Sequence, residues 1–254
     1  MEDNIKIISI KKLKKIGMYE LTTSMDKIEV SDDIIVKFRL EKDLEIDSTL
    51  YKKIKKENEK RNIFFKVCNY ISYGMRSEYE IYKYLEERDV SQADIIKIIK
   101  ELKDLNMVDD EMLAKFILDS TIRNKKGPKV FYNKLFERRL KVNKDDFIYD
   151  EDMEEEVLDV VIPKLVDKKT NLPIKKQKEQ LYQKLIRDGF SGSLIEKKIN
   201  SISFTSNALD YLDNEIKKLK KKYEKLPDDD KQTKIIQSLM RKGYEYSDIK
   251  KVIF

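Results

Sequence analysis

The sequence repeats itself at intervals of about fifty residues. Residues 81–99 align without a gap with residues 181–199 and with residues 235–253, and residues 131–140 align with the first half of the same segment. The clearest repeated position is a leucine that recurs after 50, 50 and 54 residues, at Leu85, Leu135, Leu185 and Leu239. A period of this length is typical of a supersecondary unit that is copied along the chain and shares its core with its neighbours.

Each repeat has the pattern of helices joined by short turns. Its apolar residues recur every three or four positions, which is the spacing of one helix face. Ser77 followed by Glu80 fits a capping box at the start of a helix, and Ser91 and Asp109 begin the next two helices. Gly127-Pro128 opens the second repeat with a proline at the first helical position.

The ends of the first helices differ between repeats. Gly189 and Gly243 stand where a helix commonly ends on a residue in the left-handed conformation. Asp89 and Arg139 occupy the same place in the first two repeats.

Helices of about 12–16 residues bury little surface in groups of three, so neighbouring repeats are expected to stack. We predict a mostly α-helical fold in which tandem three-helix repeats stack into an elongated body, with a small β-rich N-terminal extension. The aligned leucines and the residues three positions before them are predicted to form the repeat core: Tyr82, Leu85, Tyr132, Leu135, Tyr182, Leu185 and Leu239.

The first part of the chain has a different pattern. Residues 5–10, 18–23 and 27–30 are short, partly alternating and rich in isoleucine, which predicts a three-stranded meander. Ser31 and the two aspartates after it are expected to cap a short helix that ends at Phe38. The predicted domains are an extension at 1–47, a connecting helix at 48–75, repeats at 76–124, 125–172 and 173–226, and a partial fourth repeat at 227–254.

Composition excludes much enzyme chemistry. The chain has no histidine, and its six glycines form neither a dinucleotide-binding nor a P-loop pattern. The acidic runs 154–156 and 228–230 carry oxygen ligands that suit Mg²⁺, but consecutive helical side chains point in different directions, so solvated or capping roles are expected. We expect no catalytic residue, no metal site and no cofactor.

The sequence also bears on location. Cys68 is the only cysteine, which excludes an internal disulfide and suits a reducing compartment; it is expected to lie in the core. The apolar runs are shorter than the roughly 20 residues that span a bilayer, and the first residues do not resemble a secretory signal. A cytoplasmic monomer is expected.

Charge is sharply segregated in the middle of the chain. Residues 121–144 hold nine basic side chains and one acid, and residues 145–163 hold nine acids and no base. An ordinary soluble face mixes both signs, so the basic stretch is a candidate binding surface, with a merely solvated helix face as the alternative. Its candidate residues are Lys125, Lys126, Lys129, Lys134, Arg138, Arg139 and Lys141.

Two geometric expectations concern these cations. Lys134, Arg138 and Lys141 recur at helical spacing, so they are expected to share one face, opposite the core residues Phe131 and Leu135.

The second expectation concerns Arg76, which stands beside a helix N-terminus, where the helix dipole disfavours a cation. It is expected either to pair with Asp109 or Asp110 or to contact a binding partner.

The residues taken in order resemble the RecX family. RSEYEIYKYL, with YISYGM before it and LKDLNMVDDEMLAKFILD after it, is similar to the family's first repeat. RNKKGPKVFYNKL is similar to its second repeat and LYQKLIRDGFSGSLIEKKI to its third. The resemblance covers about residues 60–254, and the N-terminal strands are similar to the extension of longer members.

The resemblance implies a non-enzymatic protein that acts in recombination, DNA repair and the SOS response. Members are expected to bind RecA, to lodge in the groove of the RecA–DNA filament, and to modulate filament assembly, ATP hydrolysis and strand exchange. DNA is then contacted through the filament. Arg76 and the seven cations of the basic stretch are the candidate filament-binding residues.

Two other functions fit the same features. The tandem helices and basic stretches suit a protein that binds single-stranded DNA or RNA directly, although no recognition-helix pattern stands out. A scaffold whose charges only solvate it is the third hypothesis.

Overall fold

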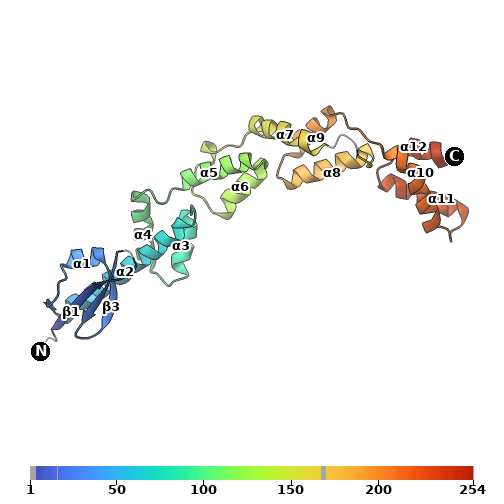
Figure 1. Cartoon of the computed structure of the whole chain (residues 1–254). Helices are drawn as coiled ribbons and strands as arrows, with labels where there is room; N and C mark the ends of the chain where they lie inside the picture. The colour runs from blue at the N-terminus through green and yellow to red at the C-terminus, as the bar shows by residue number, and fades with distance from the viewer. Residues whose placement is uncertain (1–3, 16, 167–169, 254) are drawn as a thin grey trace. The chain divides into compact units, whose positions relative to one another are not determined.

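The computed structural model describes residues 4–15, 17–166 and 170–253, and these contain twelve α-helices and a small sheet (Figure 1). The chain forms two compact units, Met1–Leu113 and Ala114–Phe254. A largely helical fold with a small N-terminal sheet agrees with the prediction. None of the helices in the described part of the chain is long and apolar enough to cross a membrane.

The first unit begins with an antiparallel sheet of four strands, in the order β3-β2-β1-β4. Three of them, β1 (Ile5–Lys12), β2 (Met18–Thr23) and β3 (Lys27–Ser31), form the predicted meander. The sequence did not predict the fourth, β4 (Glu45–Ile46), because two residues are too short to show alternation. Helix α1 (Asp32–Phe38) follows β3 as expected.

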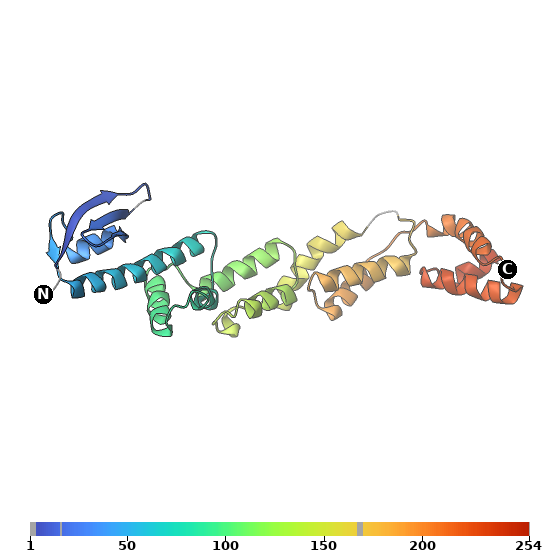
Figure 2. The ribbon, with the colours of Figure 1, turned by 90° about the horizontal axis from the view of Figure 1, so that it is seen from below.

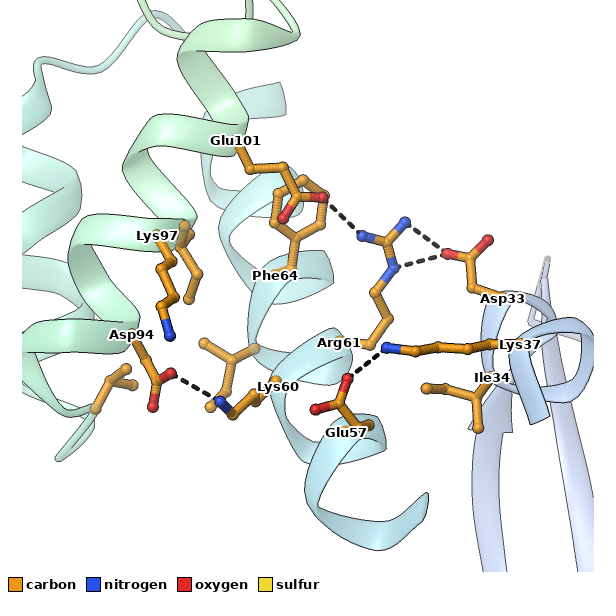
Figure 3. Close-up of a pocket in the computed structure, with 13 residues that line it drawn as sticks. Asp33, Ile34, Lys37, Glu57, Lys60, Arg61, Phe64, Asp94, Lys97 and Glu101 are labelled. Atoms are coloured by element: carbon orange, nitrogen blue, oxygen red, sulfur yellow. Dashed lines mark hydrogen bonds and ion pairs between the residues drawn. The ribbon is translucent and has the colours of Figure 1, made fainter. Parts of the chain in front are cut away.

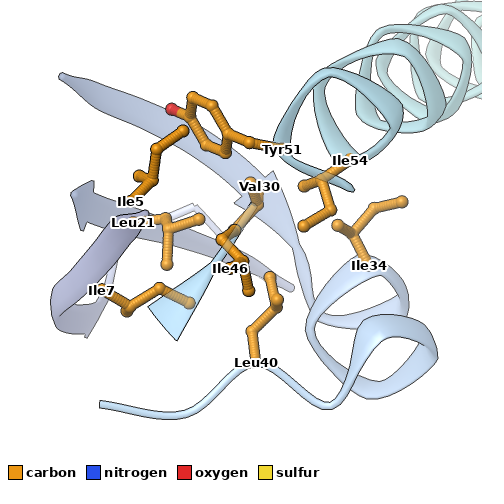
Figure 4. Packing of buried hydrophobic residues seen from close by; sticks show 9 residues of the cluster. All are labelled: Ile5, Ile7, Leu21, Val30, Ile34, Leu40, Ile46, Tyr51 and Ile54. Atoms are coloured by element: carbon orange, nitrogen blue, oxygen red, sulfur yellow. The ribbon is translucent and has the colours of Figure 1, made fainter. Parts of the chain in front are cut away.

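A long helix, α2 (Ser48–Ser72), covers the sheet with its N-terminal part (Figures 1 and 2). The Asp47 carboxylate caps this helix by accepting the Leu50 N–H at 2.7 Å. The sheet and the two helices enclose one apolar core (Figure 4), formed by Ile5, Ile7, Leu21, Val30, Ile34, Leu40, Ile46, Tyr51 and Ile54.

The second part of α2 belongs to a different core. It packs with α3 (Glu78–Glu86) and α4 (Gln92–Asp104), and the buried residues from the three helices form one cluster. The predicted capping box at Ser77 and Glu80 is present, and the Ser91 hydroxyl caps α4. The cluster contains Phe64, Val67, Ile81, Leu85, Ile95, Ile98, Leu102 and Val108.

Helix α5 (Asp110–Arg123) contains the boundary between the two units. The second unit continues with α6 (Pro128–Glu137), the 3-10 turn η1 (Lys144–Asp146), α7 (Glu151–Leu165), α8 (Ile174–Arg187) and α9 (Gly192–Ser201). A second 3-10 turn, η2 (Ala208–Tyr211), leads into α10 (Leu212–Lys222), α11 (Asp228–Arg241) and α12 (Tyr246–Ile253), which share a core.

The first helix of every repeat ends in the same left-handed turn. The leucine carbonyl accepts the N–H of the residue five positions later, at distances of 3.3, 3.1, 3.1 and 3.2 Å from Leu85 to Leu239. The residue before each of these donors has a positive φ, which is 57° at Asp89, 47° at Arg139, 92° at Gly189 and 93° at Gly243. The aspartate and the arginine therefore form the same turn as the glycines.

Close backbone packing explains why the last two turns use glycine. The Gly127 N–H donates to the Asp188 carbonyl at 2.9 Å, and the Lys129 N–H donates to the Gly189 carbonyl at 3.1 Å. A Cβ on Gly127 would lie 2.3 Å from the Gly189 carbonyl carbon, and a Cβ on Gly189 would lie 2.8 Å from Val130 Cγ2. A Cβ on Gly243 would likewise lie 3.0 Å from the Lys176 Cβ. The first helix of one repeat thus begins against the turn of the next.

The aligned leucines are buried, with 0% exposure at three of them and 8% at Leu135. Of the tyrosines three positions earlier, Tyr132 lies at the surface, so its prediction as a core residue is wrong, whereas Tyr82 packs against the cluster of α2, α3 and α4. Tyr132 is 39% exposed, and Tyr82 and Tyr182 are half-buried. A phenol must keep its hydroxyl hydrogen-bonded, and Tyr132 does so by accepting the Tyr149 N–H at 3.2 Å. The core position lies one residue before, at Ile81, Phe131, Leu181 and Ile235.

Replacing the buried leucine of α6 tests the repeat core. Leu135→Ala should lower the free energy of unfolding by about 2–5 kcal/mol, because it removes buried methyl groups and leaves a cavity. Asn133→Ala, on the exposed side of the same helix, should change it by less than about 0.5 kcal/mol. Urea unfolding of both variants measures the difference, and equal losses would contradict the assigned register.

The close contact between Gly127 and Gly189 leads to a second prediction. Gly127→Ala should destabilise the protein by about 1–3 kcal/mol or more, because the new methyl group meets backbone atoms that cannot move aside independently. Gly192→Ala is the matched control, since its Cβ would meet side-chain ends rather than backbone, with the Tyr182 hydroxyl nearest at 3.0 Å. Thermal unfolding should separate the two; a Gly127→Ala variant as stable as the parent would show that this contact does not form.

Candidate interaction surface

The acidic runs have structural roles. Asp150 caps α7, and Glu154, only 4% exposed, accepts the Ser191 N–H at the start of α9. Glu155 pairs with Lys198 at 2.7 Å, and Asp228 begins the first turn of α11. Over the described residues, the acidic and cysteine side chains form no group of three or more that could hold a metal ion.

The first unit has a cleft of about 500 Å³ between α1, α2 and α4 (Figure 3). Arg61 lies at its centre, 2.5 Å from Asp33 of α1 and 3.0 Å from Glu101 of α4, with its guanidinium 4.7 Å from the Phe64 ring centre. Lys37 pairs with Glu57 at 2.6 Å, and Lys60 pairs with Asp94 at 2.9 Å. The opposite charges neutralise one another, so the cleft walls are held together by ion pairs. Sequence reasoning missed the cleft because its residues come from three helices.

Arg76 has a different environment from the predicted ion pair. Its guanidinium lies over the Tyr70 ring at 4.4 Å, Tyr70 stacks on Tyr84 at 4.3 Å, and Arg88 covers the other side at 3.5 Å from the Tyr84 ring centre. Asp110, which is buried, accepts the Glu78 N–H at 2.9 Å and so supports the start of α3. The cation beside the helix start is therefore placed by an aromatic face.

This arrangement predicts that Arg76 and Tyr70 are coupled in their effects on stability. A double-mutant cycle on stability with Arg76→Ala and Tyr70→Leu should give a coupling of about 0.5–1 kcal/mol, the size of a partly exposed cation–π contact. The same cycle with Asp110→Asn is the comparison. Coupling to Asp110 and none to Tyr70 would instead support the ion pair expected from the sequence.

The cations that open α6 do not share one role. Lys126 donates to Asp188 at 2.6 Å, and Lys184 reaches the same carboxylate at 3.2 Å. Burial alone would raise the pKa of Asp188, but these two lysines outweigh it and lower the pKa. Lys126 therefore joins α6 to the turn after α8.

Lys125 lies beside another lysine, Lys164. It is exposed, and its contact with the Lys164 ammonium of α7 lowers its pKa. Two ammonium groups this close repel each other, and a bound anion relieves that repulsion. Lys125, Lys129 and Lys164 are all exposed to solvent, as are Arg123, Arg139 and Lys141.

The predicted basic face of α6 is corrected by the structure. Lys134 and Arg138 are half-buried rather than opposite the core. At about 100° per residue, position 134 lies only about 60° from Phe131, whereas position 133 lies on the far side of the helix. Arg138, Arg139 and Lys141 each have an interaction within the protein. The solvent face of α6 instead presents Lys129, Asn133 and Phe136.

Sequence reasoning missed Phe136, which is the most exposed large apolar residue in the described part of the chain. Its side chain is 85% exposed, and Tyr132, one turn earlier, is 39% exposed. The sequence did contain a signal for its exposure, because Phe136 directly follows the repeated leucine and so lies on the side of the helix away from the core. There the other repeats have Glu86, Ile186 and Met240.

Comparison with known proteins places this fold in a class. The family model described as RecX, first three-helix domain matches residues 66–102, which include the end of α2, all of α3 and most of α4. The model described as RecX, third three-helix domain matches residues 209–253, from η2 to α12. The third-domain match therefore lies on the last three helices and not on residues 181–199, where the sequence resemblance placed it.

Complete proteins and a solved structure show the same likeness. Two relatives named Regulatory protein RecX, from Staphylococcus aureus strains JH9 and Newman, are each 30% identical over 225 residues, which cover 86% of this chain and 83% of the relative. A solved structure, described as the crystal structure of regulatory protein RecX, aligns with a TM-score of 0.55 and 26% identity, covering 76% of this chain and 97% of that chain.

These findings define a protein of tandem three-helix domains similar to regulatory proteins. The chain belongs to the RecX family.

Proposed function

We propose that this protein is a non-enzymatic regulator that binds RecA and the RecA–DNA filament. It modulates filament assembly, ATP hydrolysis and strand exchange during recombination and DNA repair, and it acts in the cytoplasm as a monomer without a cofactor. The observation that carries the proposal is the family relationship, since relatives that match over most of both chains are named regulatory proteins.

The surface assigned to this function is the basic region at the start of α6. Lys125, Lys129 and Lys164 are exposed there, and the first of them lies beside the last. An acidic wall of the filament groove, or the phosphates within it, would supply the opposite charge. Contacts made by several tandem domains add through avidity, so no single deep pocket is needed.

The other cations named from the sequence are not assigned to direct contact in this proposal. Lys126 pairs with Asp188, so we assign it to positioning the surface, whereas Arg76 lies over Tyr70 in the first unit and is not part of this surface. Lys134 and Arg138 are half-buried, so we assign them no contact in the surface.

Direct binding of single-stranded DNA or RNA is the second candidate, favoured by the adjacent Lys125 and Lys164. A phosphate binder should lose affinity with salt, with a log–log slope of about −0.7 per phosphate contacted for single strands. Sedimentation with bare single-stranded DNA and with RecA-coated DNA, at two salt concentrations, separates the two candidates. Binding that requires RecA supports the filament, and equal binding to bare DNA supports the second candidate.

Charge reversal tests the surface. The combined variant Lys125→Glu, Lys129→Glu and Lys164→Glu should fold normally but bind RecA–DNA filaments at least about tenfold more weakly, a change of about 1.4 kcal/mol. It should also lose its effect on RecA ATP hydrolysis, because the complementary charge is gone. Co-sedimentation and a steady-state ATPase assay provide the measurements.

The matched control reverses three exposed lysines of α2, at Lys52, Lys56 and Lys66. It changes the net charge by the same amount and should keep its binding and its effect on RecA. If both variants lose binding equally, net charge rather than this surface accounts for the interaction. If neither loses it, the binding surface lies elsewhere.

A further inference from the structure

The exposure of Phe136 is not required by the packing of α6. The helix has its own core residues, Phe131 and Leu135, which are 0% and 8% exposed on the opposite side. A phenylalanine that is 85% exposed keeps almost its whole ring in water and gains little from the fold. Single exposed apolar residues are ordinary, so the surroundings of this one decide what it means.

Other aromatic groups lie on the same pair of helices. Tyr132 precedes Phe136 by one helical turn and is 39% exposed, and Phe116 of α5 is 52% exposed. The two helices, α5 and α6, are joined by a short turn and lie side by side in both views (Figures 1 and 2). Aromatic side chains of this kind are typical of the anchors at the centre of protein–protein contacts.

The charge around these aromatic residues indicates the kind of partner. Lys129 lies on the solvent face of α6 together with Phe136, two helical turns away. Lys125, which is also exposed, precedes the helix by three residues, and Glu137 is the one acid of the stretch 121–144. An apolar side chain with lysines towards one end of its helix complements a protein surface that has an apolar pocket and an acidic edge. A single-stranded nucleic acid would complement the lysines with its phosphates and stack a base on the phenyl ring, so binding of bare single-stranded DNA that depends on Phe136 would overturn this choice of partner.

We propose that Phe136 is the apolar anchor of a protein-docking surface on α6, and that it inserts into a pocket with acidic edges on the partner. This inference rests on the proposed function, which makes the partner a RecA protomer within the filament. Tyr132 and Phe116 extend the apolar contact, and Lys129 contributes to the rate of encounter rather than to the lifetime of the complex.

The test compares the parent protein with Phe136→Ala for binding to RecA filaments on single-stranded DNA, by biolayer interferometry at fixed salt. Truncation of a central aromatic anchor should weaken binding by about 30-fold or more, mainly through faster dissociation. Phe136→Leu should retain part of the affinity, because it keeps an apolar side chain. Circular dichroism and thermal unfolding should show an unchanged fold, since the ring is outside the core.

Val36→Ala is the matched control, because Val36 is also an apolar helical residue and is 75% exposed, but it follows the acids Asp32 and Asp33 on α1. It should bind within about twofold of the parent. A Phe136→Ala variant that binds as tightly as the parent overturns the anchor and leaves the proposed function standing. A parent protein that does not bind the filament overturns both. Self-association of the parent that is lost in Phe136→Ala would identify a second copy of the chain as the occupant and would also overturn the proposal.

Discussion

The structure depends on one backbone hydrogen bond that recurs in every repeat. The carbonyl of the repeated leucine accepts the N–H of the residue five positions later. The chain can make this bond only if the residue four positions after the leucine takes a left-handed conformation. The turn ends the first helix and directs the chain into the second helix while the leucine side chain stays in the core. Because the same atoms close the turn each time, Asp89 and Arg139 can replace glycine without changing the fold.

The turn also determines how one repeat meets the next. At Gly189 the start of α6 approaches so closely that two of its N–H groups donate to carbonyls of the turn, and Lys126 adds an ion pair with Asp188. At Gly243 the start of α8 packs on the turn in a similar way. These contacts fix the orientation of α6 within the second unit, and they leave the side of the helix that bears Phe136 open to solvent.

Charge is used differently in the two units. In the cleft of the first unit, the acids and bases named above pair with one another across three helices, so their charges cancel. In the second unit, Lys125 and Lys164 lie together with the same sign. Surface ion pairs contribute little to stability, whereas an uncompensated basic surface attracts acidic partners. This contrast, together with family membership, makes α6 the most informative place to test binding.

The sequence by itself determined the local elements and the repeat. Ser77 with Glu80, Ser91 and Gly127-Pro128 each begin a helix where they were expected to, because capping depends on residues only a few positions apart. Tertiary structure alone decided which residues are exposed: Tyr132 lies at the surface, and Lys134 and Arg138 are half-buried. It also placed Arg76 over Tyr70 and added β4 to the sheet. Spacing gives the relative angles of side chains around a helix, but the direction of the core is set by helices that are distant in the sequence, and no local pattern records that direction.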